Sequence, residues 1–182
     1  HLRTRRQRQM CIRDSAKALD FATKAHGDQV RKYTGEPYTN HLVEVMNIVR
    51  TVKSDDSMLA AALLHDTIED TSVTEADVKK EFGDRIAQLV VELTDISKPE
   101  DGNRATRKAM DRDKLAKVSD DAQTIKLADL ISNGKDIAIN DPKFAKVFLN
   151  EKRQLLEVLD RGDPALMKKA KNILDTYFMV DA

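Results

Sequence analysis

The residues best suited to chemistry follow directly on the most apolar run of the chain, residues 58–64. The next six positions hold one imidazole and three carboxylates, in the order His65, Asp66, Glu69 and Asp70. Buried charges are costly unless they are paired or bound to a metal. On a continuous helix, residues four apart share a face, which pairs His65 with Glu69 and sets the two aspartates on the adjoining face. The first two residues suit a metal ion and the last two suit orienting or deprotonating a water molecule; the alternative is a solvent-facing helix end.

Two other regions carry residues of the same kind. His41 begins an expected helix, where a lone histidine is more often a core or capping residue. Asp129 and Asn133 stand four apart on one helix face, and Lys126 one turn earlier makes a salt bridge an equal alternative. A set of two imidazoles and two carboxylates suits manganese, iron, zinc or magnesium better than a structural cysteine site. Its members are His41, His65, Asp66 and Asp129.

Basic side chains gather in two places. Arg31 and Lys32 stand ten residues before His41. The second group lies on and just before an expected helix and consists of Arg104, Arg107, Lys108 and Arg112. If both groups face the metal, they supply positive charge for a polyphosphate. The alternative for the second group is an ordinary solvated basic face.

The composition excludes several classes of protein. The chain has 182 residues, which predicts one domain, and 31 basic against 31 acidic residues, which argues against binding nucleic acid by bulk charge. Aromatic residues make up 4% and tryptophan is absent, so base-stacking platforms are not expected. No apolar run approaches the roughly 18 residues of a membrane span. A single cysteine excludes an internal disulfide framework and fits a reducing, cytoplasmic compartment.

Residues 1–13 differ from the rest of the chain. They contain five arginines, show no apolar period and include the lone Cys11. A basic arm or a targeting peptide is one interpretation. We expect instead a non-native or disordered extension, and we expect the folded domain to comprise residues 14–182.

The remaining sequence predicts helices throughout. Apolar spacing predicts a helix from Asp14 or Ser15 to His26, then a loop to Tyr38. Further helices are expected at about 40–52, 55–70, 74–83, 84–94, 105–117, 121–139, 142–160 and 164–177. Gly134 costs a helix about 1 kcal/mol relative to alanine, which predicts an irregularity there. No strand pattern is convincing, so the fold class is all-α, with about eight to nine helices.

Three segments together resemble the hydrolase domain of the RelA/SpoT family, most closely its stand-alone small alarmone hydrolases. The segments are His26-Gly-Asp-Gln-Val-Arg-Lys-Tyr-Thr-Gly-Glu-Pro-Tyr-Thr-Asn-His41, Ala62-Leu-Leu-His-Asp-Thr-Ile-Glu-Asp-Thr71 and Ile125-Lys-Leu-Ala-Asp-Leu-Ile-Ser-Asn133. The resemblance covers about residues 15 to 160 and implies an HD-domain helical bundle. It also implies manganese-dependent removal of the 3′-pyrophosphate from ppGpp or pppGpp.

The resemblance further implies a role for each matching residue. The metal ligands would be His41, His65, Asp66 and Asp129, and the residues that activate water would be Glu69 and Asp70. Substrate contacts would come from Arg31, Lys32 and Asn133, with Arg104, Arg107 and Lys108 as candidates for the pyrophosphate. The partner would be a small guanosine polyphosphate, without nucleic acid or membrane, and the sequence leaves homo-oligomerisation open.

The chain departs from the family pattern at a few positions. Leu42 replaces a common proline after His41, and residues 130–132 read Leu-Ile-Ser where Arg-Leu-His is usual. These changes leave the metal set intact and bear on substrate identity. A second hypothesis is therefore hydrolysis of another nucleotide, such as the 2′-phosphate of NADPH or a nucleoside 5′-phosphate. A nucleotide sensor without turnover is a third, disfavoured because Glu69 and Asp70 are both present.

Overall fold

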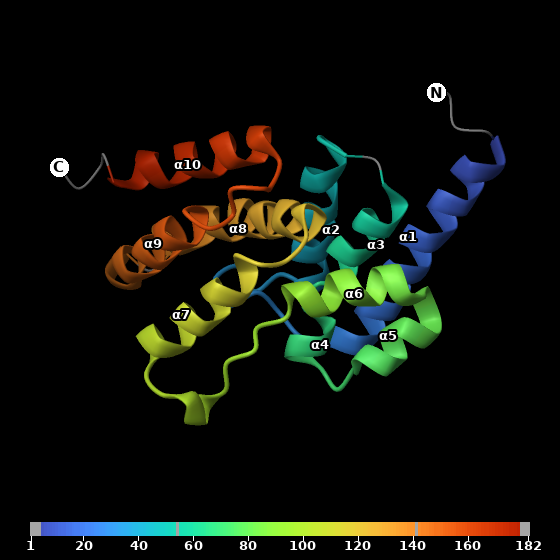
Figure 1. The fold of residues 1–182 in the computed structure, drawn as a ribbon, viewed down its shortest axis with the longest axis horizontal. Coiled ribbons are helices and arrows are strands. Elements are labelled where there is room, and N and C mark those ends of the chain that lie inside the picture. Colours follow the sequence, from blue (N-terminus) through green and yellow to red (C-terminus); the bar gives the residue numbers. More distant parts are fainter. Residues whose placement is uncertain (1–4, 54, 141, 179–182) are drawn as a thin grey trace. The chain divides into compact units, whose positions relative to one another are not determined.

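The computed structural model describes residues 5–53, 55–140 and 142–178 (Figure 1). Its helices are α1 Arg5–His26, α2 Tyr38–Arg50, α3 Asp56–Leu64, α4 Thr67–Asp70, α5 Glu75–Phe82, α6 Asp84–Leu93, α7 Arg104–Leu115, α8 Asp120–Asn140, α9 Pro142–Leu156 and α10 Pro164–Phe178, with a 3₁₀ turn η1 at Pro99–Asp101. Nine of these α-helices have eight or more residues, and α4 is a single turn. The described ranges contain no strand beyond an isolated bridge between Val30 and Pro37. The all-α prediction is confirmed, and no helix among the residues described is long and apolar enough to cross a membrane.

The first helix differs from its predicted start. It begins at Arg5, nine residues before Asp14, so residues 5–13 continue the helix rather than stand outside it. The predicted end at His26 is confirmed, because Gly27 follows with a φ of +53° that closes the helix. That residues 1–13 are non-native stays a prediction, as does the boundary at residue 14.

The first compact unit consists of the described residues up to Arg31 together with Glu36–Thr94. Helix α3 lies at its centre and packs against α1, α2 and α6 (Figure 1). Every residue from Met58 to Leu64 is buried. An alanine, leucine and methionine helix has no polar face to turn toward water, which is why it occupies this central position.

Local sequence signals set the helix ends in this unit. The Asp55 side chain accepts a hydrogen bond from the Met58 amide at 3.0 Å and begins α3. Thr74 and Asp77 form the predicted capping box of α5, each side chain bonding the other residue's backbone amide. Gly83, with a φ of +83°, turns the chain from α5 into α6.

The second compact unit consists of Lys32–Gly35 and the described residues from Asp95 onward. Within it α8 packs against α9 and α10. The irregularity expected at Gly134 is wrong, because α8 is continuous from Asp120 to Asn140. A Cβ atom at Gly134 would lie 3.2 Å from Ile173 Cγ2 of α10, so the glycine permits a close helix approach.

Candidate metal centre

The regular helix is interrupted by a turn at His65 and Asp66. Helix α3 ends at Leu64, and Asp66 adopts φ −100° and ψ −1° before α4 begins. Two side chains form hydrogen bonds with backbone carbonyl groups at the end of α3. His65 Nδ1 lies 2.9 Å from the Ala62 oxygen, and Thr67 Oγ1 donates to the Leu64 oxygen at 2.6 Å. The prediction of one continuous helix over 55–70 is therefore wrong, and so are the helix faces assigned from it.

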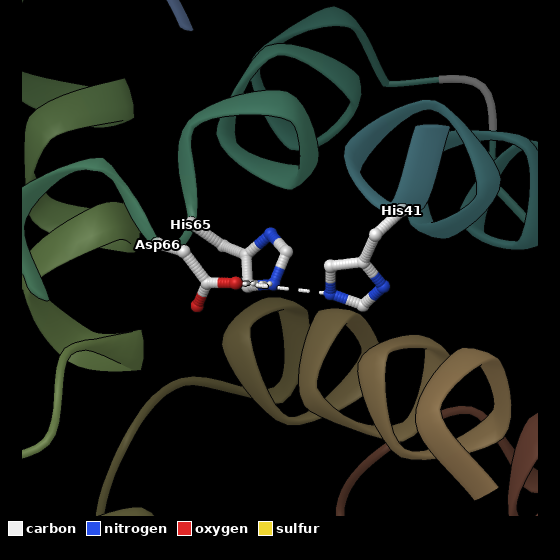
Figure 2. Close-up of side chains that lie close together, drawn as sticks. All are labelled: His41, His65 and Asp66. Atoms are coloured by element: carbon white, nitrogen blue, oxygen red, sulfur yellow. Dashed lines mark ion pairs between the residues drawn. The ribbon is translucent and has the colours of Figure 1, made fainter. Parts of the chain in front are cut away.

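The break brings three of the predicted ligands together within the first unit. Figure 2 shows His41 of α2 facing His65 and Asp66, which follow α3. One donor atom from each residue lies within 4.8 Å of the other two. Asp66 Oδ2 lies 2.9 Å from His65 Nε2 and 3.7 Å from His41 Nε2. Both imidazoles are only 1% exposed.

The chemistry of these donors fits a divalent transition metal. A backbone carbonyl can only accept a hydrogen bond, so His65 Nδ1 carries the proton and Nε2 presents its lone pair toward Asp66. A histidine ligand held in this way by its other nitrogen is a common arrangement in metal sites. The Tyr38 hydroxyl donates to Asp66 Oδ2 at 2.6 Å and holds that carboxylate in place. Two imidazoles and a carboxylate are a donor set for manganese, iron or zinc.

The predicted catalytic carboxylates lie on the single-turn helix α4. Glu69 and Asp70 are both exposed. Asp70 Oδ2 accepts a hydrogen bond from Gln29 Nε2 at 3.1 Å. Sequence reasoning missed both Gln29 and Tyr38. Tyr38 stands one helical turn before His41, which is a usable signal, whereas no sequence pattern links Gln29 to a residue 41 positions away.

Asp129, the fourth predicted ligand, belongs to the second unit. Its side chain is 6% exposed, and its carboxylate lies 3.0 Å from Lys126 Nζ. Asn133 Nδ2 donates to Asp129 Oδ1 at 2.7 Å. The salt bridge considered as an alternative therefore exists, and the predicted contact residue Asn133 holds the same carboxylate. At the departure from the family pattern, residues 130–132 are at most 1% exposed.

Arg31 and Lys32, the first predicted basic group, differ in exposure and in the side chains that they contact. The Arg31 side chain is 10% exposed, and its Nη1 lies 3.5 Å from Glu44 Oε2. Lys32 is exposed, and its ammonium lies 5.0 Å from the centre of the Tyr33 ring.

The second predicted group borders a pocket of about 170 Å³ within the second unit. Arg104 forms two hydrogen bonds with Glu151, at 2.7 and 2.8 Å, and these raise the pKa of Arg104. Lys108 Nζ lies 2.8 Å from Asp95 Oδ2. The pocket is lined by Asp95, Arg104, Lys108, Asp111, Arg112, Leu115, Lys126, Phe148, Glu151, Lys152 and Leu155. Arg107 is not part of this lining, and its buried Nε has no hydrogen-bond partner among the described residues.

Charges around this pocket influence one another. Burial alone would raise the pKa of Asp95, but Lys126 and Lys108 outweigh it and hold that pKa below its usual value. Burial, followed by the nearby ammonium of Lys126, lowers the pKa of Lys152 to about 8. Lys126 and Lys152 were not among the predicted site residues, because neither stands in the basic cluster of α7.

Comparison with known proteins points in one direction. A profile described as the HD domain matches residues 18–177. A Drosophila melanogaster protein, guanosine-3′,5′-bis(diphosphate) 3′-pyrophosphohydrolase MESH1, is 40% identical over 127 residues, which cover 68% of this chain and 69% of that protein. An Aquifex aeolicus guanosine-3′,5′-bis(diphosphate) 3′-pyrophosphohydrolase is 45% identical over 82 residues, or 45% of this chain and 12% of that protein.

A solved structure agrees with these relatives. It is described as a metazoan ortholog of SpoT that hydrolyzes ppGpp and plays a role in starvation responses. It superposes with a TM-score of 0.80 at 31% identity, covering 90% of this chain and 94% of that one.

Proposed function

The chain belongs to the HD-domain family and to its RelA/SpoT-type ppGpp hydrolases, and we propose that it removes the 3′-pyrophosphate from ppGpp and pppGpp. The observation that carries this proposal is the convergence of His41, His65 and Asp66 on one point of the first unit. The products are GDP or GTP and pyrophosphate. The relatives named above act on the same class of guanosine polyphosphate.

The proposed metal is Mn²⁺, held by His41, His65 and Asp66, with Asp129 as the fourth ligand. A bound divalent cation would lower the pKa of a water molecule and stabilise negative charge on phosphate oxygens. The fixed Nδ1 proton of His65 and the Tyr38 hydroxyl on Asp66 support those two assignments, and the 3.7 Å between His41 Nε2 and Asp66 Oδ2 supports the third. Asp129 is assigned from the family pattern.

The proposed roles of Glu69 and Asp70 concern the attacking water. A carboxylate oxygen of this pair accepts a proton as the water oxygen adds to the phosphorus joined to O3′. The bond between that phosphorus and O3′ breaks, and O3′ takes up a proton. Both carboxylates are exposed on α4, so a water molecule has access to them.

The basic residues and Asn133 are proposed to bind the substrate. Arg31 and Lys32 hold the nucleotide, and Asn133 contacts the sugar or phosphate region. For the pyrophosphate we propose Arg104, Arg107 and Lys108, whose charges suit phosphate oxygens. Arg31, Lys32, Arg104, Lys108 and Asn133 each have a hydrogen bond, an ion pair or a ring contact within the protein, so substrate would have to compete with those contacts.

The proposed setting is the cytoplasm, with a small-molecule substrate and no nucleic-acid or membrane partner. The single cysteine favours a reducing compartment. Homo-oligomerisation stays open.

Product analysis tests the proposed function. Protein stripped of metal and reloaded with manganese is incubated separately with ppGpp, GDP, GMP and NADPH, with Asp66→Ala as the control. We expect pyrophosphate and GDP from ppGpp alone, and no product from Asp66→Ala. Inorganic phosphate from NADPH or GMP, with ppGpp untouched, would retain the metal site and assign the protein as a different nucleotide phosphohydrolase. Binding of ppGpp without any product would indicate a sensor.

A further inference from the structure

A short chain of hydrogen bonds within the first unit ends on one of the proposed catalytic carboxylates. Gln29 donates from Nε2 to Asp70 Oδ2 at 3.1 Å. Its other amide atom, Oε1, lies 2.8 Å from His26 Nδ1. The amide therefore connects a buried imidazole at the end of α1 with a carboxylate on α4, two helices that pack together.

The direction of each hydrogen bond follows from the atoms. An ionised carboxylate only accepts, so it requires the NH₂ end of the Gln29 amide. The oxygen end then faces His26 and requires a proton on Nδ1. His26 Nε2 is buried and has no hydrogen-bond partner among the described residues. With the proton on Nδ1, the neutral ring carries none on Nε2, so no buried N–H is left without an acceptor. His26 is thus fixed in one tautomer, and it fixes the orientation of the amide.

The backbone of Gln29 is held as firmly as its side chain. Its amide donates to the His26 oxygen at 3.0 Å, and its carbonyl accepts from the Tyr38 amide at 2.9 Å. Gly27, at φ +53°, makes the turn that permits this path. His26 is 6% exposed and stacks against Tyr38 with ring centres 4.9 Å apart. Because both its backbone and its side-chain amide are held by hydrogen bonds, the Gln29 side chain has few alternative positions relative to α4.

We propose that Gln29, oriented by His26, is a positioning residue for Asp70. Its hydrogen bond occupies Oδ2 and leaves Oδ1 to face the attacking water. This inference rests on the proposed function, because it assigns Gln29 a part in the activation of that water. The Gln29 side chain bonds Asp70 and His26, neither of which is a proposed metal ligand, so removing its amide should leave manganese affinity unchanged.

The test measures kcat, KM and manganese affinity for Gln29→Met, which keeps the length of the side chain and removes the amide. We expect kcat to fall by about 10- to 100-fold, the usual effect of removing a supporting contact, with KM and calorimetric manganese affinity unchanged. Gln88→Met is the matched control, since the exposed Gln88 also donates to a carboxylate, Glu92, at 3.0 Å. It should retain the wild-type kcat.

A thermodynamic cycle then assigns the path. In an Asp70→Asn background, Gln29→Met should cause no further loss, because the group it positions no longer functions. His26→Phe keeps a ring against Tyr38 but loses the Nδ1 donor, and should lower kcat without adding to Gln29→Met. Circular dichroism and melting temperature identify a variant that has failed to fold. In that case His26→Asn, which retains an N–H donor, is used instead and should keep kcat close to that of the wild type, and a kcat as low as that of Gln29→Met would contradict the role of His26.

Several results would overturn the inference. They are a wild-type kcat for Gln29→Met, an equal loss in the Asp70→Asn background, or a parallel loss of manganese affinity. Full activity of Asp70→Asn would remove the role of Asp70 itself. If the wild-type protein acts on NADPH or GMP rather than ppGpp, the same cycle is run with that substrate. A wild-type protein that releases no product from any of them refutes the proposed function, and the inference falls with it.

Discussion

Replacing Tyr38 by phenylalanine isolates one hydrogen bond at the candidate metal centre. The hydroxyl lies 2.6 Å from Asp66 Oδ2, a length typical of a hydroxyl donating to an ionised carboxylate. The ring is retained, so its contacts with His26 and His41, at 4.9 and 5.4 Å between ring centres, are conserved. The change therefore acts on the carboxylate and leaves the packing around it intact.

The size of the effect follows from the exposure of the acceptor. A hydrogen bond to a charged group contributes about 1.5–3 kcal/mol, and each 1.4 kcal/mol is about tenfold in affinity. The Asp66 side chain is 16% exposed, so a water molecule can replace part of what the hydroxyl provided. The lower end of the range applies, and we expect Tyr38→Phe to weaken manganese binding by about tenfold.

Isothermal titration of metal-free protein with manganese measures this directly. Tyr33→Phe is the matched control, because it removes the same hydroxyl from a tyrosine that is not a proposed metal ligand, and its manganese affinity should equal that of the wild type. A Tyr38→Phe protein that binds manganese within about twofold of the wild type would refute the reasoning that this hydroxyl holds a metal ligand.

Three further predictions concern the site and the stability of the fold. Asp66→Ala should lose manganese and activity together, whereas Glu69→Ala should keep manganese and lose about 10²- to 10⁴-fold in kcat; loss of metal from Glu69→Ala in calorimetry would contradict this division of roles. Gly162→Ala should lower the free energy of unfolding by about 1–3 kcal/mol, because the new Cβ would lie 2.6 Å from the buried Leu127 Cδ1, and an unchanged urea midpoint would contradict it. The pKa of Lys152 is lowered to about 8, so below pH 8 the folded state bears the full cost of that charge, and the cost is relieved as the pH rises from 8 toward the usual value of 10.5. Lys152→Met should therefore stabilise the metal-free protein at pH 7, on the order of 1 kcal/mol after solvent screening, and a gain that did not shrink between pH 8 and 10.5 would show that charge is not the cause.

Features that depend on neighbours in sequence were predictable from the chain alone. The Asp55 cap and the Thr74–Asp77 capping box act over three residues, so the residue types at these positions predict them. The all-α class followed from apolar periodicity. The chemistry of His41, His65 and Asp66 followed from their donor types, because two imidazoles and a carboxylate in an apolar setting need a partner.

The tertiary structure decided how those donors meet. Periodicity predicted that the helix continues through His65 and Asp66. The structure has a break there, at which side chains form hydrogen bonds with backbone carbonyl groups of α3. At this break Asp66 lies against His65. The Gln29–Asp70 contact spans 41 positions and depends on α1 packing against α4.

Packing likewise decided the meaning of residues that the sequence left ambiguous. Gly134 weakens an isolated helix, yet in the fold it admits Ile173 of α10 at a distance that a methyl group would crowd. From the sequence, Arg104 was interpreted as a positive charge available to a phosphate group. In the folded chain it is paired with Glu151, which is 47 residues away. Local patterns report which groups a helix carries. Which groups face one another depends on the contacts between helices, because these contacts join residues that no sequence period relates.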